Sequence, residues 1–452
     1  MHLWRATTEF LYRPVDVASQ VAFRILFGIL MLVEVYRYFT NGWIERYFVE
    51  PDFHFTYYGF GWVTPWPGDG MYWHFVGLGL LAIAVALGFC YRLAATLLFL
   101  GFTYVFLLDQ ANYLNHFYLI ALVSFLMIFV PAHRDRSLDA VRKPGLRSEV
   151  VPAWSLWLLR FQIGVPYFFG GVAKLNADWL RGEPIRTWLA ERVEYPLVGR
   201  FFDEEWCVQV FAYGGLLLDL LVVPLLLWRR TRWVALGFAL FFHGMNSWLF
   251  GIGVFPWFMI AGTTLFLDPD WPRRALFLIG PRTSTVDEVS SSNTGRAFVV
   301  VLLAAWVVFQ VVVPLRHFSY DGSVHWTEDG HRFSWHMMLR SKSSSLTFRV
   351  VAPARGRTWE LDEDHCRQYL SRRQYEKMTT RPDMILQFAH RLAREFAEPA
   401  RGPVEVYGTA LVSLNGRPPQ PMIDSTVDLA REPRSLEKPT WILPLTTPLP
   451  GR

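Results

Sequence analysis

Residues 214–250 read GGLLLDLLVVPLLLWRRTRWVALGFALFFHGMNSWLF, and this stretch decides the fold class. It joins two apolar runs, 207–228 and 232–250, through a short turn that carries Arg229 and Arg230, and Arg232 begins the second run. Each run is about as long as the roughly 20 residues that a helix needs to cross a bilayer. Arginines in such a turn stay in water on one side of the membrane. The stretch therefore predicts a hairpin of two transmembrane helices.

Outward from this hairpin, similar apolar runs recur along most of the chain. Seven more candidate spans lie at about 18–38, 71–90, 93–109, 116–131, 154–173, 252–267 and 297–315. Only 18% of the 452 residues are charged, whereas about 25% are charged in a typical soluble domain. We therefore predict a mainly α, polytopic membrane helix bundle of about nine transmembrane helices. The net charge of +5 is too modest to support nucleic-acid binding.

The basic residues of the loops indicate an orientation. If the N-terminus is cytosolic, fifteen Arg and Lys residues fall in cytosolic loops and only six in the loops of the other side. Because cytosolic loops carry the excess of Arg and Lys, this orientation is the expected one. It predicts a multi-pass membrane protein with its C-terminal region outside the cytosol, in the periplasm, at the cell exterior or, in a eukaryote, in an organelle lumen.

The composition changes near residue 317, where apolar runs shorten and charges increase. The segment LTFRVV (346–351) is strand-like, and 383–397 has the periodicity of an amphipathic helix with Asp383 as its N-cap. VEVYGTALVSLNGR alternates and ends in Asn415-Gly416, which predicts a hairpin with MIDSTVDL as the returning strand. We predict a transmembrane domain, residues 1–316, followed by a small extracytoplasmic α+β cap domain, residues 317–452. With three Cys there is no disulfide scaffold, and whether Cys207 pairs with Cys366 stays open.

Polar residues in or beside the spans mark candidate functional positions, because hydrocarbon disfavours them. They are Asn115 and His116, Lys174, His243 with Asn246, and His317. On the predicted orientation all lie toward the outer ends of their spans and could converge on one cavity. Gly170-Gly171 before Lys174 would let another backbone or a flat ligand approach closely.

Each of these positions also has a purely structural reading. Lys174 could be a lysine that extends to the membrane surface, and Asn115-His116 could cap a helix. His243 and Asn246 could form interhelical hydrogen bonds, and His317 could lie at the interface. No two histidines have metal-ligand spacing, so we predict no metal. Two further charged residues, Arg24 and Arg160, are expected to pair with acids such as Glu34 or Asp219.

Several motifs together resemble the vitamin K-dependent gamma-glutamyl carboxylase family, in its bacterial, HTTM-domain form. They include RPVDVASQVAFRILFGILM (13–31), YVFLLDQANYLNHFYL (104–119), GGVAKLNADWL (170–180), FHGMNSWLFGIGVF (242–255), HWTEDGHRFSWHMMLRSKS (325–343) and SLNGRPPQPMIDSTVDL (413–429). The resemblance covers nearly the whole chain, and its motifs are specific in combination.

The resemblance implies an enzyme, a carbon–carbon lyase-type carboxylase coupled to epoxidation of vitamin K hydroquinone. This family converts peptide Glu to gamma-carboxyglutamate using reduced vitamin K, O₂ and CO₂. Lys174 matches the family's catalytic lysine, and His116 matches a residue assigned to carbanion formation or CO₂ capture. Asn115, His243 and His317 match positions near the cofactor, and we add Asn246 to that set because it shares a helix face with His243. A stretch implicated in gripping the substrate glutamate corresponds to Trp326, Ser334, Trp335, Arg340 and Lys342.

The expected partners are therefore membrane lipid, a quinol, and a Glu-containing peptide or protein. Two alternatives stay open: a non-catalytic membrane carrier or quinone-binding protein that keeps the fold, and a quinol-oxygenating enzyme with another substrate. They differ at Lys174, because Arg could replace a lysine that acts only by its charge but cannot replace a base.

Overall fold

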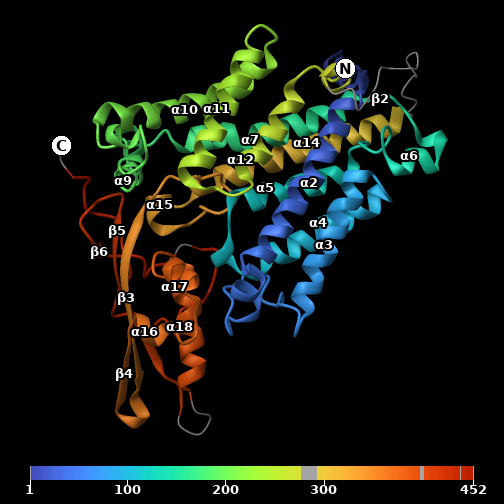
Figure 1. The fold of residues 1–452 in the computed structure, drawn as a ribbon. Coiled ribbons are helices and arrows are strands. Elements are labelled where there is room, and N and C mark those ends of the chain that lie inside the picture. Colours follow the sequence, from blue (N-terminus) through green and yellow to red (C-terminus); the bar gives the residue numbers. More distant parts are fainter. Residues whose placement is uncertain (1, 276–292, 398–401, 438, 451–452) are drawn as a thin grey trace.

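A computed structural model describes residues 2–275, 293–397, 402–437 and 439–450, which form a helical bundle with a small sheet domain at one end (Figure 1). The bundle helices are α1 (His2–Tyr12), α2 (Ala18–Thr40), α3 (Gly70–Leu87), α4 (Tyr91–Leu108), α5 (Asn115–Phe129), α6 (Leu138–Arg142), α7 (Ala153–Ala173), α8 (Ala177–Leu180), α9 (Ile185–Ala190), α10 (Glu205–Leu227), α11 (Arg232–Phe250), α12 (Phe255–Thr263), α13 (Trp271–Ala275) and α14 (Asn293–Leu315). The short strands β1 (Pro14–Asp16) and β2 (Val150–Pro152) pair near the N-terminus.

Each of the nine predicted spans corresponds to a helix, and the protein is a polytopic membrane helix bundle. The count of nine is not confirmed, because six described helices are long and apolar enough to cross a membrane: α2, α3, α4, α10, α11 and α14. Two others, α5 and α12, are shorter apolar helices. The remaining helix, α7, carries Arg160 and Pro166 and is mostly buried among the other helices. It is therefore a central helix of the bundle.

Close helix packing in the bundle depends on small residues. At Gly28 of α2, a Cβ atom would lie 2.7 Å from the Ala82 carbonyl oxygen and from the Ala86 Cβ of α3. Glycine lets the two backbones approach, as is common between membrane helices. Leu, Val and Phe side chains on the outer faces of α10, α11 and α14 are exposed, as expected for surfaces that face lipid.

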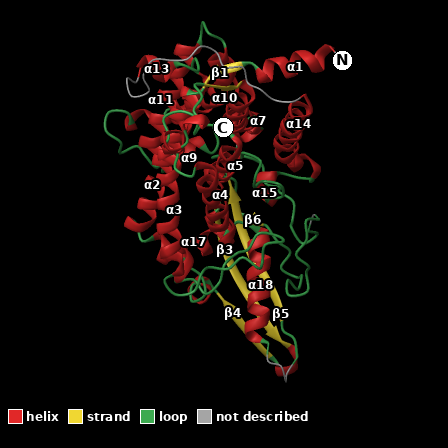
Figure 2. Ribbon diagram, turned by 90° about the vertical axis from the view of Figure 1, so that its right-hand side faces the viewer, coloured by secondary structure: helices red, strands yellow, loops and turns green. Residues whose placement is uncertain are grey.

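The C-terminal part is an α+β unit, which we call the cap. Its sheet has the order β4-β3-β5-β6 with antiparallel neighbours. The elements are β3 (Lys342–Ala352), β4 (Arg357–Leu361), α16 (Glu363–Cys366), α17 (Arg372–Met378), α18 (Pro382–Phe396), β5 (Glu405–Leu414) and β6 (Gln420–Pro421). Figure 2 shows α18 lying along the sheet that it covers.

Several details of the cap confirm or correct the sequence interpretation. The strand at 346–351 and the helix at 383–397 are present, and Asn415-Gly416 forms a turn in which both residues have positive φ. Asp383 is not the N-cap: α18 begins at Pro382, and the Asp383 carboxylate accepts hydrogen bonds from Gln110 and Arg434 instead. The returning strand is only Gln420–Pro421, so the prediction for MIDSTVDL is wrong. All three cysteines are free.

The cap and the helices share their hydrophobic cores. Trp335, from the segment that leads into the cap, is 1% exposed and packs against Tyr118 of α5. In the other direction, Phe55 from the α2–α3 connection is fully buried in the cap core with Phe388. Since each part buries an aromatic side chain of the other, the cap is held firmly on the bundle.

An ion pair joins the cap turn to the short helix α8, which follows α7. Arg417 donates to both oxygens of Asp178 at 2.6 and 2.7 Å, and Asn415 donates to the same carboxylate at 2.8 Å. We expect Arg417→Ala to lower the free energy of unfolding by about 3 kcal/mol, because it leaves Asp178 mostly buried without its cation. Denaturation of the detergent-solubilised protein would measure this loss. An Arg417→Ala variant as stable as wild type would show that the pair contributes nothing.

Candidate active site

A large cavity opens among the helices on the side of the bundle that meets the cap. Its volume is about 620 Å³, within the roughly 300–1,000 Å³ range of small-molecule sites. The walls come from α5 and from the helices α7 to α12, and the segment 337–338 adds Met337 and Met338. Most lining residues are apolar or aromatic, and the polar ones are few. Five of the predicted residues, Asn115, His116, Lys174, His243 and Asn246, line it together.

Lys174 lies at the C-terminal end of α7, where its side chain is almost fully buried. Its Nζ donates to Asp219 Oδ2 at 2.5 Å and to the Gly170 carbonyl at 3.3 Å. The glycines before it allow this contact: a Cβ on Gly171 would lie 2.7 Å from the Leu220 side chain and 3.1 Å from the Leu220 nitrogen. The expected close approach of a second backbone is therefore made by α10.

Asp219 is a site residue whose place the sequence interpretation missed. Its carboxylate was expected to pair with an arginine in a span, and that prediction is wrong. Arg24 instead donates to the carbonyls of Ala132 and Arg136, and Arg160 donates to those of Leu265 and Leu267. The other acid, Glu34, pairs with Arg37. One ion pair, Lys174–Asp219, therefore lies inside the cavity wall.

His116 and Asn115 begin α5 and face the cavity. The N-cap is Leu114, without a capping side-chain bond, so Asn115 does not serve as a helix cap. Its amide donates to the His336 carbonyl at 3.3 Å and accepts from the Tyr113 hydroxyl at 2.9 Å. The His116 ring stacks on Phe255, with ring centroids 5.6 Å apart. Asn115 thus ties α5 to the segment that leads to the cap.

His243 lies on α11 and is 2% exposed. Its Nε2 lies 2.5 Å from the hydroxyl of Tyr167, a second site residue that the sequence interpretation missed. The nearest sequence signal was a phenol in the middle of a predicted span, next to Pro166. Asn246 donates to the Phe242 carbonyl one turn earlier, which leaves its amide oxygen free for the cavity.

His317 lies outside the cavity lining, in a cluster of four histidines. The ring of His336 lies 4.7 Å from His317, 5.2 Å from His325 and 5.3 Å from His331, between centroids. Burial lowers the pKa of His325 to about 4 and that of His336 to about 2, so these rings are neutral at pH 7. In the part of the chain that the structure describes, no three His, Cys, Asp or Glu side chains are arranged to hold a metal.

The predicted glutamate-gripping residues lie behind the cavity wall and not in it. Trp326 and Trp335 are each 1% exposed, and the Ser334 hydroxyl donates to the Gly330 carbonyl. Arg340 and Lys342 both bond Glu328 at 2.7 Å. Burial opposes ionisation of Glu328, but Arg340 and Lys342 outweigh burial and lower its pKa to about 2.

The Lys342 ammonium therefore already binds partners inside the protein. Besides Glu328, its ammonium donates to the carbonyls of Trp326 and Thr380, and only 4% of the side chain is exposed. Burial, more than any neighbouring charge, lowers its pKa to about 8. A cation that is free to bind a substrate carboxylate therefore has to be sought elsewhere. The role of Lys342 as a direct substrate contact stays a prediction.

Comparison with known protein families gives two matches that together span most of the chain. Residues 12–271 match the HTTM domain, and residues 295–448 match the lumenal domain of vitamin K-dependent gamma-carboxylase. The chain belongs to the vitamin K-dependent gamma-carboxylase family. No solved structure matches it.

The first match ends at α13 and the second begins in α14, so one bundle helix, α14, falls in the second match together with the cap. The HTTM match covers the helices from α2 to α12, which build most of the cavity, and the lumenal-domain match covers α14 and the cap. Met337 and Met338 line the cavity from within the second match. The cavity of this family member is thus built by both matched regions.

Proposed function

We propose that this protein is a quinol-dependent gamma-glutamyl carboxylase of the membrane. It would convert Glu side chains of an exported peptide or protein to gamma-carboxyglutamate with reduced vitamin K, O₂ and CO₂. The observation that carries the proposal is the gathering of Lys174, Asp219, His116, Asn115 and His243 around one largely apolar cavity. The family membership supports it.

The cavity suits a quinol with an apolar tail. Aromatic walls such as Phe242 and Phe255 offer flat surfaces for a ring, and the polar groups are few enough to orient its two hydroxyls. Oxygenation of the bound quinol supplies a base strong enough to remove the γ-proton of glutamate, which no side chain can do at neutral pH. In the complete reaction CO₂ adds to the γ-carbon, the quinol is oxidised to its epoxide, and O₂ is reduced to the epoxide oxygen and water.

Lys174 is assigned as the base that accepts a quinol hydroxyl proton. Its amine must be neutral for this step, and the 2.5 Å contact with Asp219 offers a place for the displaced proton. Lys174 then releases the quinol proton to solvent, and Asp219 returns the displaced proton to the Lys174 amine.

The remaining cavity groups are assigned to orientation and carbon chemistry. His116, stacked on Phe255, is placed to act on the glutamate carbanion or to hold CO₂. His243 is fixed by Tyr167, so its ring presents one tautomer to the cavity. Asn115 and Asn246 orient the quinol oxygens. His317 does not line the cavity, so it would act through the neighbouring ring of His336.

The protein is proposed to span a bacterial cytoplasmic membrane with its cap outside the cytosol. Figure 1 shows the N-terminus and the Arg-rich turn between α10 and α11 at the end of the bundle away from the cap. That arrangement agrees with arginines in the cytosol. The cavity then opens toward exported peptides.

The test is incorporation of labelled bicarbonate into a Glu-containing peptide by membranes that hold the protein, with and without the reduced quinol. We expect label in the peptide only when quinol and O₂ are both present, together with stoichiometric epoxide. Quinol oxidation without label would indicate another substrate. No quinol oxidation, with quinol nevertheless bound, would indicate a carrier, and either result would overturn the proposal.

A further inference from the structure

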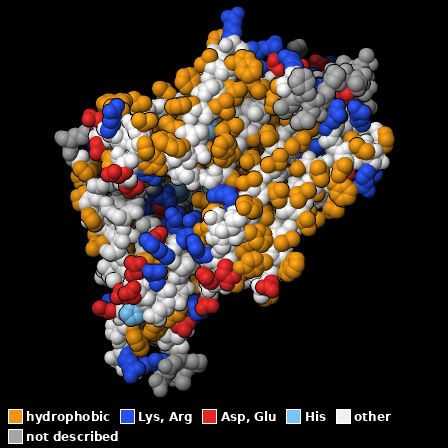
Figure 3. Space-filling view, in the orientation of Figure 1, with side chains coloured by type: hydrophobic (Ala, Val, Ile, Leu, Met, Phe, Trp, Pro, Cys, Tyr) orange, Lys and Arg blue, Asp and Glu red, His pale blue; other side chains and the backbone are white. Residues whose placement is uncertain are grey.

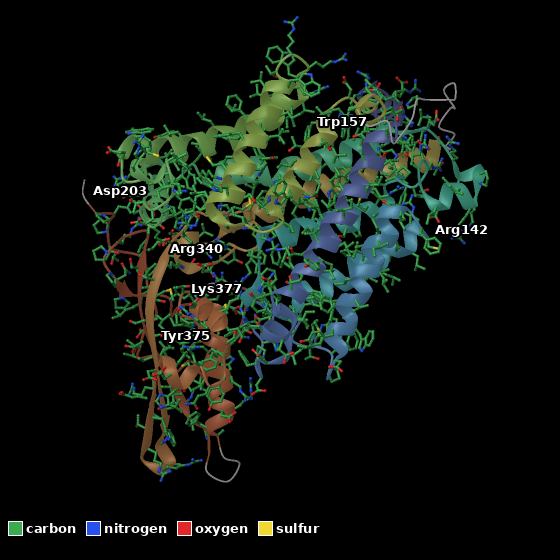
Figure 4. The ribbon with its side chains drawn as sticks, in the orientation of Figure 1. Arg142, Trp157, Asp203, Arg340, Tyr375 and Lys377 are labelled. Carbon is green, nitrogen blue, oxygen red and sulfur yellow. The ribbon has the colours of Figure 1, made fainter. Side chains whose placement is uncertain are left out.

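Five cationic side chains gather where the cap meets the membrane helices, beside the glutamate-gripping segment. They are Arg332, Arg340, Lys342, Lys377 and Arg381. Mutual repulsion shows that they lie near one another. After burial, repulsion from Arg381, Arg373 and Arg340 lowers the pKa of Lys377 to about 8, and Arg340 and Arg381 also lower the pKa of Lys342. Arg332 and Arg340 in turn lower the pKa of Arg381, again after burial. Figure 4 places Arg340 and Lys377 close to this junction, and Figure 3 shows Lys and Arg side chains around a hollow there.

Acidic partners do not balance this cluster. Glu328 is shared by Arg340 and Lys342. Among the residues that the structure describes, Arg332, Lys377 and Arg381 have no carboxylate within ion-pair distance, although Arg381 is only 9% exposed. Nearby acids are occupied: Asp383 pairs with Arg434, and Glu376 pairs with Arg372. Arg381 is buried, Arg332 and Lys377 are half-buried, and none of the three has an ion-pair partner among the described residues, so this cluster favours an anionic ligand.

The cluster lies a short chain length from the cavity. Met338 lines the cavity, and Arg340 follows two residues later, so at most about 7 Å separates their Cα atoms. A bound extended peptide has the same spacing per residue. The other cations adjoin Arg340, since each repels it or is repelled by it. If one glutamate of such a peptide reaches the cavity, its neighbours two to four residues away therefore come near this cluster.

We propose that Arg332, Lys377 and Arg381 form a second recognition site, for carboxylates located two to four residues from the reacting glutamate of an acidic peptide. This inference rests on the proposed function. Three cations on three segments suit several carboxylates of one extended chain better than one small anion. They belong to the cap and to the segment before it, outside the membrane-spanning helices, so a peptide fits this site better than a lipid headgroup.

Direct binding tests the site without depending on carboxylation. Full-length protein in nanodiscs of neutral lipid would be titrated with two fluorescent peptides that share one central Glu. One peptide carries Asp at positions two to four on both sides, and the other carries Asn there. We expect the Asp peptide to bind at least about tenfold more tightly, with the difference shrinking as salt is raised.

Variants then assign the difference to the proposed cations. Lys377→Gln and Arg332→Gln should each weaken the Asp peptide about tenfold and leave the Asn peptide unchanged. Arg394→Gln removes the same charge from an exposed position on α18 and should change neither affinity. Matching melting temperatures would show that the variants fold.

Three outcomes would overturn the inference. Equal affinity for both peptides would remove the need for a carboxylate site. Loss of binding to vesicles with anionic lipid, with peptide binding unchanged, would assign the cations to a headgroup. A raised KM for bicarbonate alone would assign them to a small anion. Peptide binding as expected without any label incorporation would instead refute the proposed function and leave this site in place.

Discussion

Lys174→Arg is expected to stop quinol-dependent carboxylation while leaving the fold intact. Arg keeps the positive charge and can still pair with Asp219, but it does not give up its proton in a protein. The loss should be about 10²–10⁴-fold in kcat, the usual contribution of a positioned base. The measurement is label incorporation and quinol oxidation side by side, since both depend on the same proton transfer.

Two comparisons make this result decisive. Lys143→Arg makes the same chemical change at an exposed position after α6 and should retain full activity. Asp219→Asn should also lose activity, because it removes the group that takes the proton from Lys174. An active Lys174→Arg variant would show that the site needs only charge, as in a carrier.

Glu328→Gln is expected to lower the free energy of unfolding by about 3–5 kcal/mol, the usual cost of removing one partner of a buried ion pair. Gln leaves both Arg340 and Lys342 without the carboxylate that they share. Denaturant or thermal unfolding in detergent would measure the change. Glu376→Gln, at an exposed ion pair with Arg372, should cost less than about 1 kcal/mol.

The same carboxylate predicts how stability depends on pH. The folded pKa of Glu328, about 2, lies below its value in an unfolded chain, about 4.3. Its stabilising contribution is therefore complete above about pH 4.3 and is lost as pH falls toward 2. Wild type should lose this increment on acidification and Glu328→Gln should not. Parallel acid unfolding curves for the two proteins would contradict the assignment.

Much of the fold follows from local sequence. Apolar runs of bilayer length, such as 207–228 and 232–250, can only be satisfied as helices in lipid, because every backbone polar group must bond internally. Whether such a helix faces lipid depends on its neighbours. Local sequence does not show these neighbours. The run at 154–173 was therefore predicted as a span like the others, although this helix, α7, is mostly buried at the centre of the bundle. The short strand β6 is likewise set by its pairing with β5, and it lies just before the predicted segment MIDSTVDL.

For the candidate site too, local sequence shows some features and tertiary contacts decide the others. Polar residues in apolar surroundings are visible in the sequence, and five of the six expected around the quinol line one cavity. Tyr167 and Asp219 could not be assigned, because their partners lie 76 and 45 residues away. The gripping segment was recognised by its residue types. Sequence could not show that Glu328 already pairs with Arg340 and Lys342, nor that Arg332, Lys377 and Arg381 have no ion-pair partner within the described part of the chain.

By itself, the sequence determined the membrane helix bundle and the presence of an α+β cap, and it predicted Lys174, His116 and His243 as site residues, because hydropathy and residue chemistry are local properties. Only the tertiary structure decided which carboxylate Lys174 meets and which cations remain unpaired. Pairing depends on where helices far apart in the chain come within a few ångströms, and that distance is set by packing at residues such as Gly171.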